Sequence, residues 1–143
     1  MNREYPKLPM CGVGVVVWRD DRLLLVRRGK PPRAGRWTIP GGLQELGETV
    51  FQAAAREVLE ETSLTVEVTG LLDVIDYIEP DAAGRTRIHY TLVDVAAEWC
   101  AGDPVAGSDA ADARWFTLDT MPSNEMWSET VRIIRLSAEN RRR

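Results

Sequence analysis

The sequence predicts an α/β fold in which helices flank a mixed β-sheet. Most of the chain shows the apolar patterns of β-strands, and helical spacing occurs in two segments, one near the middle and one at the end. A sheet and a helix each have an apolar face that must be buried against another layer, so such a chain is expected to pack helices against a sheet. Its 143 residues fall within the usual size of one domain, and we expect a single domain over residues 1–143.

The strands are predicted from runs of β-forming residues bounded by turn residues. Val13 to Trp18 and Leu23 to Val26 flank the pair Asp20-Asp21, which indicates a first hairpin. After a basic loop with prolines, Trp37 to Ile39 is extended and leads into a turn at Pro40-Gly41-Gly42. Later strands are expected at Leu64 to Val68, Gly70 to Ile78, Arg87 to Ala97 and Arg114 to Thr117, with Pro80 to Gly84 as the turn of a long hairpin.

Two helices are predicted from capping and periodicity. Thr49 and Gln52 have the spacing of a capping box, in which each side chain bonds the backbone N–H of the other residue, so the first helix is expected to begin here. Its apolar stripe is predicted to comprise Phe51, Ala54, Ala55 and Val58. The second helix is expected from Ser123 or Asn124, because apolar residues recur at helical spacing as far as Ile134, ahead of a basic tail.

Composition and charge restrict the kinds of partner. The net charge of −4 gives no general attraction for a nucleic-acid polymer, so we expect a small anionic substrate that is met by local Arg and Lys side chains and by metal. Cys11 and Cys100 are far apart, without C-x-x-C spacing or a secretory leader, which favours reduced thiols in the cytoplasm over a disulfide or zinc site. The apolar runs are too short to span a membrane, so no membrane partner is expected.

The first predicted helix carries a cluster of carboxylates beside its apolar stripe. Glu57, Glu60 and Glu61 are spaced i, i+3 and i+4, which places them on one side of a helix. Each like-charged pair at this spacing costs roughly a few tenths of a kcal/mol on an exposed helix, and a bound divalent cation would reverse that cost. Acidic runs on helices are more often solvated surface, but here the preceding loop adds Glu48, and Arg56 is placed to hold Glu60 or to orient a neighbouring acid.

Together with the glycines before them, these residues resemble the Nudix box. The pattern of the box is G, five residues, E, seven residues and R-E-U-x-E-E-x-G-U, where U is aliphatic, and eight of its nine specified positions match over a span of 23 residues. The matching residues are Gly42, Glu48, Arg56, Glu57, Val58, Glu60, Glu61 and Leu64. Ser63 replaces the second glycine just past the helix, where a left-handed conformation costs a residue with a Cβ about 1 kcal/mol, so we expect that cost or a different cap.

The resemblance implies a fold and a metal site. Nudix proteins are α/β/α sandwiches with a mixed central sheet, and the two predicted helices would be the flanks. The implied ligands of Mg²⁺ (or Mn²⁺) are the carbonyl of Gly41 and the carboxylates of Glu57, Glu60 and Glu61. Hard oxygen donors without His or Cys nearby favour the same ions. Arg56 would orient the acids by charge-assisted hydrogen bonds, and Glu48 and Gly42 would support the site from the loop.

The implied chemistry is hydrolysis of the pyrophosphate bond in a nucleoside diphosphate linked to another group. Clustered metal ions would neutralise the charge of the linkage and lower the pKa of a bound water. The general base is open between Glu60 or Glu61 and the acidic loop 108–112. In that loop relatives place a glutamate, and this chain has Asp112 with Asp109 near it; a polar turn is the alternative for this loop.

Substrate contacts are expected from basic and aromatic residues. Phosphate contacts would come from the basic cluster between the first hairpin and the box, which contains Arg27, Arg28, Lys30, Arg33 and Arg36, although a solvated role is the alternative for any one of them. Four side chains are candidates to stack on a base, although core packing is favoured for each: Tyr77, His89, Trp99 and Trp127.

One position bears on the substrate itself. Relatives that cleave ADP-ribose tend to carry a proline about sixteen residues past the box, and Pro80 lies sixteen after Leu64. This favours a nucleoside diphosphate sugar such as ADP-ribose. A nucleoside triphosphate such as an oxidised purine nucleotide is the alternative, because a proline in a hairpin turn needs no substrate to explain it. Some Nudix domains bind nucleotides as sensors without hydrolysis, but the complete acid set argues against that class. By resemblance to other Nudix proteins, a homodimer is also expected.

Overall fold

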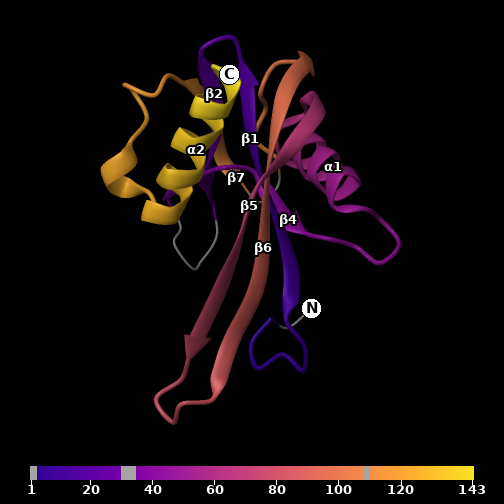
Figure 1. The fold of residues 1–143 in the computed structure, drawn as a ribbon, viewed down its shortest axis with the longest axis vertical. Helices are drawn as coiled ribbons and strands as arrows, with labels where there is room; N and C mark the ends of the chain where they lie inside the picture. The colour runs from indigo at the N-terminus through magenta and orange to yellow at the C-terminus, as the bar shows by residue number, and fades with distance from the viewer. Residues whose placement is uncertain (1–2, 30–34, 108–109) are drawn as a thin grey trace.

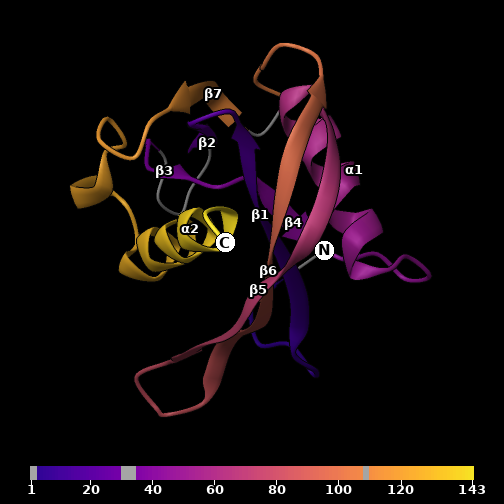
Figure 2. The same ribbon diagram turned by 45° about the horizontal axis from the view of Figure 1, so that its top comes forward.

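The computed structural model describes residues 3–29, 35–107 and 110–143. The strands are β1 (Met10–Arg19), β2 (Arg22–Arg28), β3 (Trp37–Thr38), β4 (Gly41–Leu43), β5 (Thr65–Pro80), β6 (Thr86–Ala101) and β7 (Ala110–Phe116). The helices are α1 (Val50–Thr62), between β4 and β5, and α2 (Ser128–Arg141), which follows a short 3₁₀ helix, η1 (Ser123–Glu125). α1 and α2 lie on opposite sides of the sheet (Figures 1 and 2). The predicted α/β architecture, a mixed sheet flanked by helices, is confirmed.

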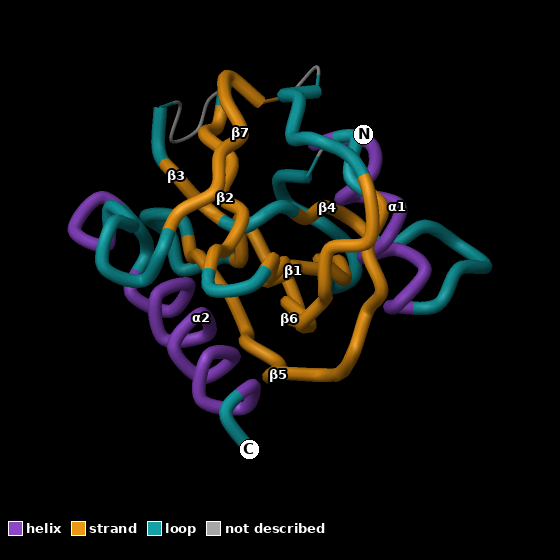
Figure 3. The backbone as a smooth tube through the Cα atoms, turned by 90° about the horizontal axis from the view of Figure 1, so that it is seen from above, coloured by secondary structure: helices purple, strands orange, loops and turns teal. Residues whose placement is uncertain are grey.

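The described strands form one mixed sheet with β1 near its centre. The order is β3-β2-β1-β6-β5, and in addition β4 pairs with β1 and β7 pairs with β2. β1 runs parallel to β6, and the other pairs are antiparallel. β2 and β4 share one edge of β1, with β4 beside its N-terminal half, at Gly12 to Gly14. The short strand β4 thereby comes to lie next to α1 (Figure 3).

The sheet has one apolar core under each helix. On the α1 side the core includes Val13, Val15 and Val17 of β1 and Ala53, Ala54 and Val58 of α1. On the α2 side it includes Val16 and Trp18 of β1 and Met126, Ile133 and Ile134. Because successive residues of a strand point to opposite faces, Gly12 and Gly14 of β1 belong to the α2 face.

The two ends of α1 are formed as their residues predict. Gln52 N–H donates to Thr49 Oγ1 at 3.1 Å and Thr49 N–H donates to Gln52 Oε1 at 2.9 Å, which completes the capping box. Ser63 has a left-handed backbone, φ 65°, and its N–H donates to the carbonyl oxygen of Leu59 at 2.9 Å. Ser63 therefore keeps the cap geometry of the missing glycine and bears the cost of its Cβ.

The buried face of α1 is rotated from the predicted stripe. Phe51 is 44% exposed and Ala55 is partly buried, whereas Ala53, Ala54 and Val58 are fully buried. The prediction for Phe51 was wrong because it took hydrophobicity as the guide, while the small side chains of the alanines let the helix approach the sheet.

The glycines before α1 also differ from prediction. Gly41 and Gly42 were expected in a turn, but they belong to β4, which pairs with β1. A Cβ on Gly41 would lie 2.1 Å from the carbonyl oxygen of Val13, so the close approach of these two strands requires glycine.

The bounds of one strand and one helix also differ from the prediction. The strands predicted on either side of Thr69 are one strand, β5, whose pairing with β6 contains bulges that absorb the irregularity. α2 begins at Ser128 rather than at Ser123 or Asn124, because the extended backbone of Trp127 separates it from the 3₁₀ helix. Of the helices described, none is both long enough and apolar enough to cross a membrane.

Candidate active site

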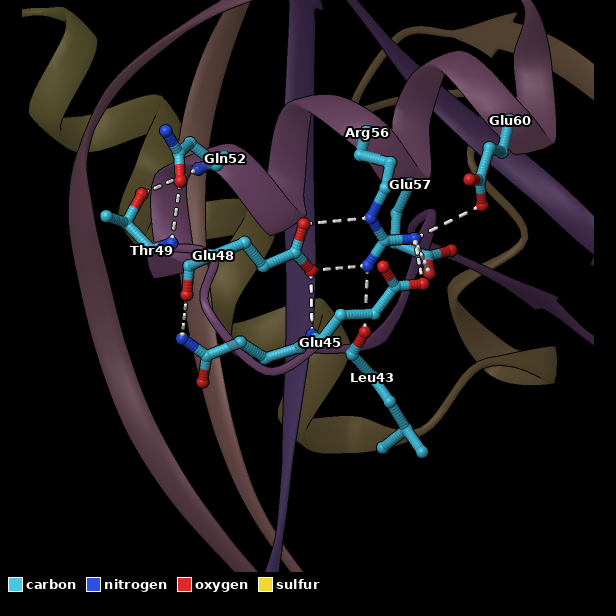
Figure 4. Close-up of polar contacts among 9 residues, drawn as sticks. Leu43, Glu45, Glu48, Thr49, Gln52, Arg56, Glu57 and Glu60 are labelled. Atoms are coloured by element: carbon cyan, nitrogen blue, oxygen red, sulfur yellow. Dashed lines mark hydrogen bonds and ion pairs between the residues drawn. The ribbon is translucent and has the colours of Figure 1, made fainter. Parts of the chain in front are cut away.

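Arg56 of α1 is the centre of a network of carboxylates. Its Nε donates to Glu48 Oε2 at 3.0 Å and its Nη2 donates to Glu48 Oε1 at 2.6 Å, a two-point contact (Figure 4). Nη2 also donates to the carbonyl oxygen of Leu43 at 3.0 Å, so the guanidinium joins α1 to the preceding loop and to β4. The hydrogen bonding between Arg56 and Glu48 raises the pKa of the guanidinium and lowers the pKa of the carboxylate.

Two further glutamates share the remaining nitrogen of Arg56. Nη1 donates to Glu57 Oε1 at 2.9 Å and to Glu60 Oε2 at 3.2 Å (Figure 4). The Glu57 side chain is 14% exposed and that of Glu60 is 59% exposed. Burial raises the pKa of Glu57, and the hydrogen bond from Arg56 opposes that change. The cluster therefore combines a desolvated carboxylate with one that solvent and ligands can reach.

The glycines of β4 lie against this acid face of α1. A Cβ on Gly42 would lie 2.4 Å from the carboxyl carbon of Glu57, so only glycine leaves room for that side chain. Gly41 N–H donates to Glu61 Oε2 at a long 3.4 Å. Two glutamates one helical turn apart thus face the backbone of the same strand, and the structure brings the predicted Gly41 and Gly42 to the site.

The donor set fits a hard divalent cation. Among the residues described, no group of three acidic, His or Cys side chains converges closely enough to hold a metal ion, because Glu57 and Glu60 bind Arg56 while Glu61 faces Gly41. The three carboxylates nevertheless project from one side of two successive helical turns beside a glycine strand. All these donors are oxygen atoms, which is the ligand chemistry of Mg²⁺ and Mn²⁺.

The loop after β6 closes the end of α1. Val105 N–H donates to the carbonyl oxygen of Thr62 at 2.9 Å, and Gly107 N–H donates to that of Glu61 at 2.7 Å. A Cβ on Gly107 would lie 2.5 Å from the carbonyl oxygen of Glu60, so the loop packs tightly against the turn that carries two of the predicted ligands. The loop continues towards Asp109, which lies outside the described residues.

Asp112 lies in β7 rather than in a loop. It pairs in register with Arg27 of β2, its Oδ2 lies 2.7 Å from Arg114 Nη2, and its Oδ1 accepts a hydrogen bond from Ala113 N–H. The expectation of a loop was wrong at this position because β7 pairs along most of β2 and begins at Ala110. In the described part of the chain, the polar contacts of the Asp112 side chain stay on its own strand.

The predicted phosphate contacts gather at the end of β2. Arg28 N–H donates to the carbonyl oxygen of Arg36 at 2.9 Å, and the side chains of Arg27, Arg28 and Arg36 are exposed. The Arg27 guanidinium lies 5.7 Å from the centre of the Trp37 ring. The other two members of the predicted group, Lys30 and Arg33, lie outside the described residues.

The aromatic side chains predicted to stack on a base lie in different parts of the structure. The Trp99 side chain already has partners within the protein. The Arg19 guanidinium lies 3.8 Å from its ring centre, and its N–H donates to the carbonyl oxygen of Gly102. Tyr77 meets Trp127 edge-on, with ring centres 5.8 Å apart, beside the start of α2. His89 is partly buried in β6.

One buried carboxylate lies outside the predicted set. Asp94 is 7% exposed and stands in β6 between the partly buried Val93 and the core residue Val95. The signal that could have found it is an acidic residue inside the apolar run from Leu92 to Ala97, since carboxylates are seldom fully buried.

Comparison with known proteins identifies the family. The NUDIX domain model matches residues 9–136, so the chain belongs to the Nudix family. It is 35% identical over 114 residues to an ADP-ribose pyrophosphatase of Methanocaldococcus jannaschii, covering 80% of this chain and 65% of the relative. It is 37% identical over 120 residues to an oxidized purine nucleoside triphosphate hydrolase of Danio rerio, covering 82% of this chain and 72% of the relative. The chain thus spans slightly less than two thirds of the first of these relatives.

A solved structure supports the same fold. The MutT NUDIX hydrolase of Burkholderia pseudomallei superposes on this chain with a TM-score of 0.77 at 31% sequence identity. The superposition covers 91% of this chain and 98% of that protein.

Proposed function

We propose that this chain is a metal-dependent pyrophosphohydrolase that cleaves the pyrophosphate bond of a nucleoside diphosphate linked to another group. The observation that carries the proposal is the network of Arg56 with Glu48, Glu57 and Glu60, set against the glycine strand β4. Membership of the Nudix family supports the same reaction. The match and the fold lead us to treat residues 1–143 as one hydrolase domain.

Glu57, Glu60 and Glu61 are the residues that would hold Mg²⁺ or Mn²⁺, with the carbonyl of Gly41 as a further oxygen donor. When bound there, the ion supplies neutralisation of the pyrophosphate charge and a more acidic water. Arg56 keeps the carboxylates oriented and ionised, and Glu48 fixes Arg56 through its two-point contact. Gly42 leaves the space that Glu57 occupies.

The proton of the attacking water needs an acceptor close to these carboxylates. We propose Glu60 or Glu61 for this role, because the exposed Glu60 and its neighbour stand on the last turn of α1, against which Gly107 of the following loop is packed. Asp112 is the alternative base, and its pairing with Arg114 would have to open first.

For the substrate we propose a nucleoside diphosphate sugar such as ADP-ribose, bound through Arg27, Arg28 and Arg36 and stacked on Tyr77. Pro80 and the ADP-ribose pyrophosphatase relative favour this choice. The second candidate is sanitation of oxidised purine nucleoside triphosphates, which the similarity to the Danio rerio hydrolase favours. A sensor that binds nucleotide without cleaving it is a third class, and the complete set of box acids argues against it.

We also propose a cytoplasmic protein acting on small molecules rather than on nucleic-acid polymers. Both cysteines are free thiols, and the net charge of −4 gives no general attraction for a polyanion. A homodimer remains a prediction from family habit.

Turnover of a substrate panel with Mg²⁺ tests the function. The panel contains ADP-ribose, other nucleotide sugars, dinucleoside polyphosphates and canonical or oxidised nucleoside triphosphates, with phosphate release measured through a coupled phosphatase. Glu61→Gln should abolish turnover, and Glu67→Gln, which changes an exposed glutamate of β5, should leave it unchanged. If the intact protein binds nucleotides but cleaves none of them, the hydrolase proposal fails for these substrates and the sensor class takes its place.

A further inference from the structure

Asp94 is a mostly buried carboxylate that has no partner among the described residues. It is 7% exposed, and no residue that the structure describes donates a hydrogen bond to it or forms an ion pair with it. In the described part of the chain no fully buried side-chain oxygen or nitrogen lacks a hydrogen-bond partner, so the carboxylate of Asp94 still reaches solvent and can accept hydrogen bonds from outside the protein. The arrangement is therefore expected to serve a ligand that brings its own donors.

Arg132, a cation whose charge acts on Asp94, is paired with other carboxylates. Arg132 of α2 binds Asp73 at 2.9 Å and Glu129 at 2.7 Å, and Asp73 stands directly opposite Asp94 on β5. Burial, with Asp73 adding to it, raises the pKa of Asp94 to about 6, and the opposite effect of Arg132 is outweighed.

The carboxylate of Asp94 leans towards β1. A Cβ on Gly14 would lie 2.3 Å from Asp94 Oδ1, so the carboxylate occupies the place of the side chain that Gly14 lacks. Gly14 pairs with Asp94 on one side and with Gly41 of β4 on the other, which puts the three residues in a row across β6, β1 and β4. Adjacent strands are about 4.8 Å apart, so the carboxylate lies about one strand spacing from Gly41.

This distance indicates which part of the substrate would lie beside Asp94. Gly41 N–H donates to Glu61, and the Gly41 carbonyl is a predicted ligand of the metal ion that would neutralise the pyrophosphate. The sugar is joined directly to the phosphate and the base lies beyond the sugar, so a group one strand away from Gly41 is level with the sugar. An ionised carboxylate only accepts hydrogen bonds, and neighbouring ribose hydroxyls supply two donors, as when an acidic residue binds the ribose of a dinucleotide.

We propose that Asp94 recognises the ribose next to the scissile pyrophosphate by accepting hydrogen bonds from its hydroxyls, and that it makes the site selective for ribonucleotides over 2′-deoxyribonucleotides. The proposal rests on the proposed function, since it places the sugar relative to Gly41. It predicts that Asp94 favours substrates such as ADP-ribose over deoxynucleoside triphosphates.

Equilibrium binding tests the proposal apart from hydrolysis. Calorimetry with AMP and 2′-deoxy-AMP at about pH 7.5, where the carboxyl is ionised, should show about tenfold tighter binding of AMP, the worth of one hydrogen bond to a charged acceptor. Asp94→Asn should reduce this ratio to about one. Asp76→Asn, which removes an exposed carboxylate from β5, should keep the ratio.

The outcomes separate the two proposals. A ratio near one in the intact protein, or an unchanged ratio in Asp94→Asn, overturns ribose recognition by Asp94. If turnover fails on every substrate while the ratio and its loss are found, the hydrolase proposal fails and ribose recognition stands. Circular dichroism and thermal melting of each variant show whether a lost ratio reflects lost folding; if Asp94→Asn is unfolded, Asp94→Ser replaces it in the same measurement, with the same outcomes.

Discussion

Replacing Asp94 by Asn is expected to stabilise the protein more at neutral pH than in acid. Asp94 is 7% exposed, and burial is the main cause that raises its pKa from 3.8 to about 6. A carboxyl with a higher pKa in the folded than in the unfolded state holds its proton more tightly when folded. The free energy of unfolding therefore falls as the pH rises from the lower of these values through the higher one. Asn does not ionise, so the variant avoids this loss.

The two pKa values set the size of the effect. The loss amounts to about 3 kcal/mol once the carboxyl is ionised in both states, and to about 1 kcal/mol near pH 4.5, where the unfolded chain is already mostly ionised. The advantage of Asp94→Asn over the intact protein should thus grow by about 2 kcal/mol between about pH 4.5 and about pH 7.5. The difference in packing between amide and carboxyl adds a contribution that does not depend on pH.

Urea unfolding at a series of pH values measures this difference. The chain has five tryptophans, Trp18 being buried in the α2-side core, so their fluorescence reports unfolding. Asp76→Asn is the matched control, and its free energy of unfolding relative to the intact protein should stay constant over the same range. A constant advantage for Asp94→Asn, or one that shrinks as pH rises, would refute the reasoning that burial holds the pKa of Asp94 high.

The remaining predictions concern the acid network and the end of α1. Arg56→Lys should lower the free energy of unfolding by about 2 kcal/mol in urea denaturation, because an ammonium cannot reproduce the two-point contact with Glu48. Gly42→Ala should reduce kcat/KM about a hundredfold on whichever substrate the panel identifies, because its Cβ displaces a glutamate of the site. Gly70→Ala, whose Cβ meets no atom within 4 Å, should leave kcat/KM unchanged, and equal losses in both variants would contradict the role of Gly42. Ser63→Gly should raise the free energy of unfolding by about 1 kcal/mol in the same urea assay, and no gain would show that the left-handed cap bears no cost.

The features that the sequence predicts well depend on residues close together in the chain. The capping box of Thr49 and Gln52 needs one helical turn, and the first hairpin needs two short strands and the turn between them. The prediction failed where a distant segment decides. Gly41 and Gly42 join the sheet because β4 meets β1, and Phe51 lies at the solvent because the alanines of α1 pack on the strands.

The candidate site divides in the same way. The spacing of Arg56, Glu57, Glu60 and Glu61 establishes by itself that one side of a helix carries a cation and three acids, because helical geometry follows from the order of residues. The same motif is the signature of the Nudix family, to which the matched residues 9–136 assign the chain.

The tertiary structure alone decided which partner each of these groups meets. Glu57 packs against Gly42, and Asp94 leans over Gly14 towards Gly41. These contacts depend on the register between strands that are far apart in the chain, and a change of register by one residue would turn each side chain to the other face of the sheet. Local spacing therefore determined which chemical groups the site has, and strand pairing determined where they lie.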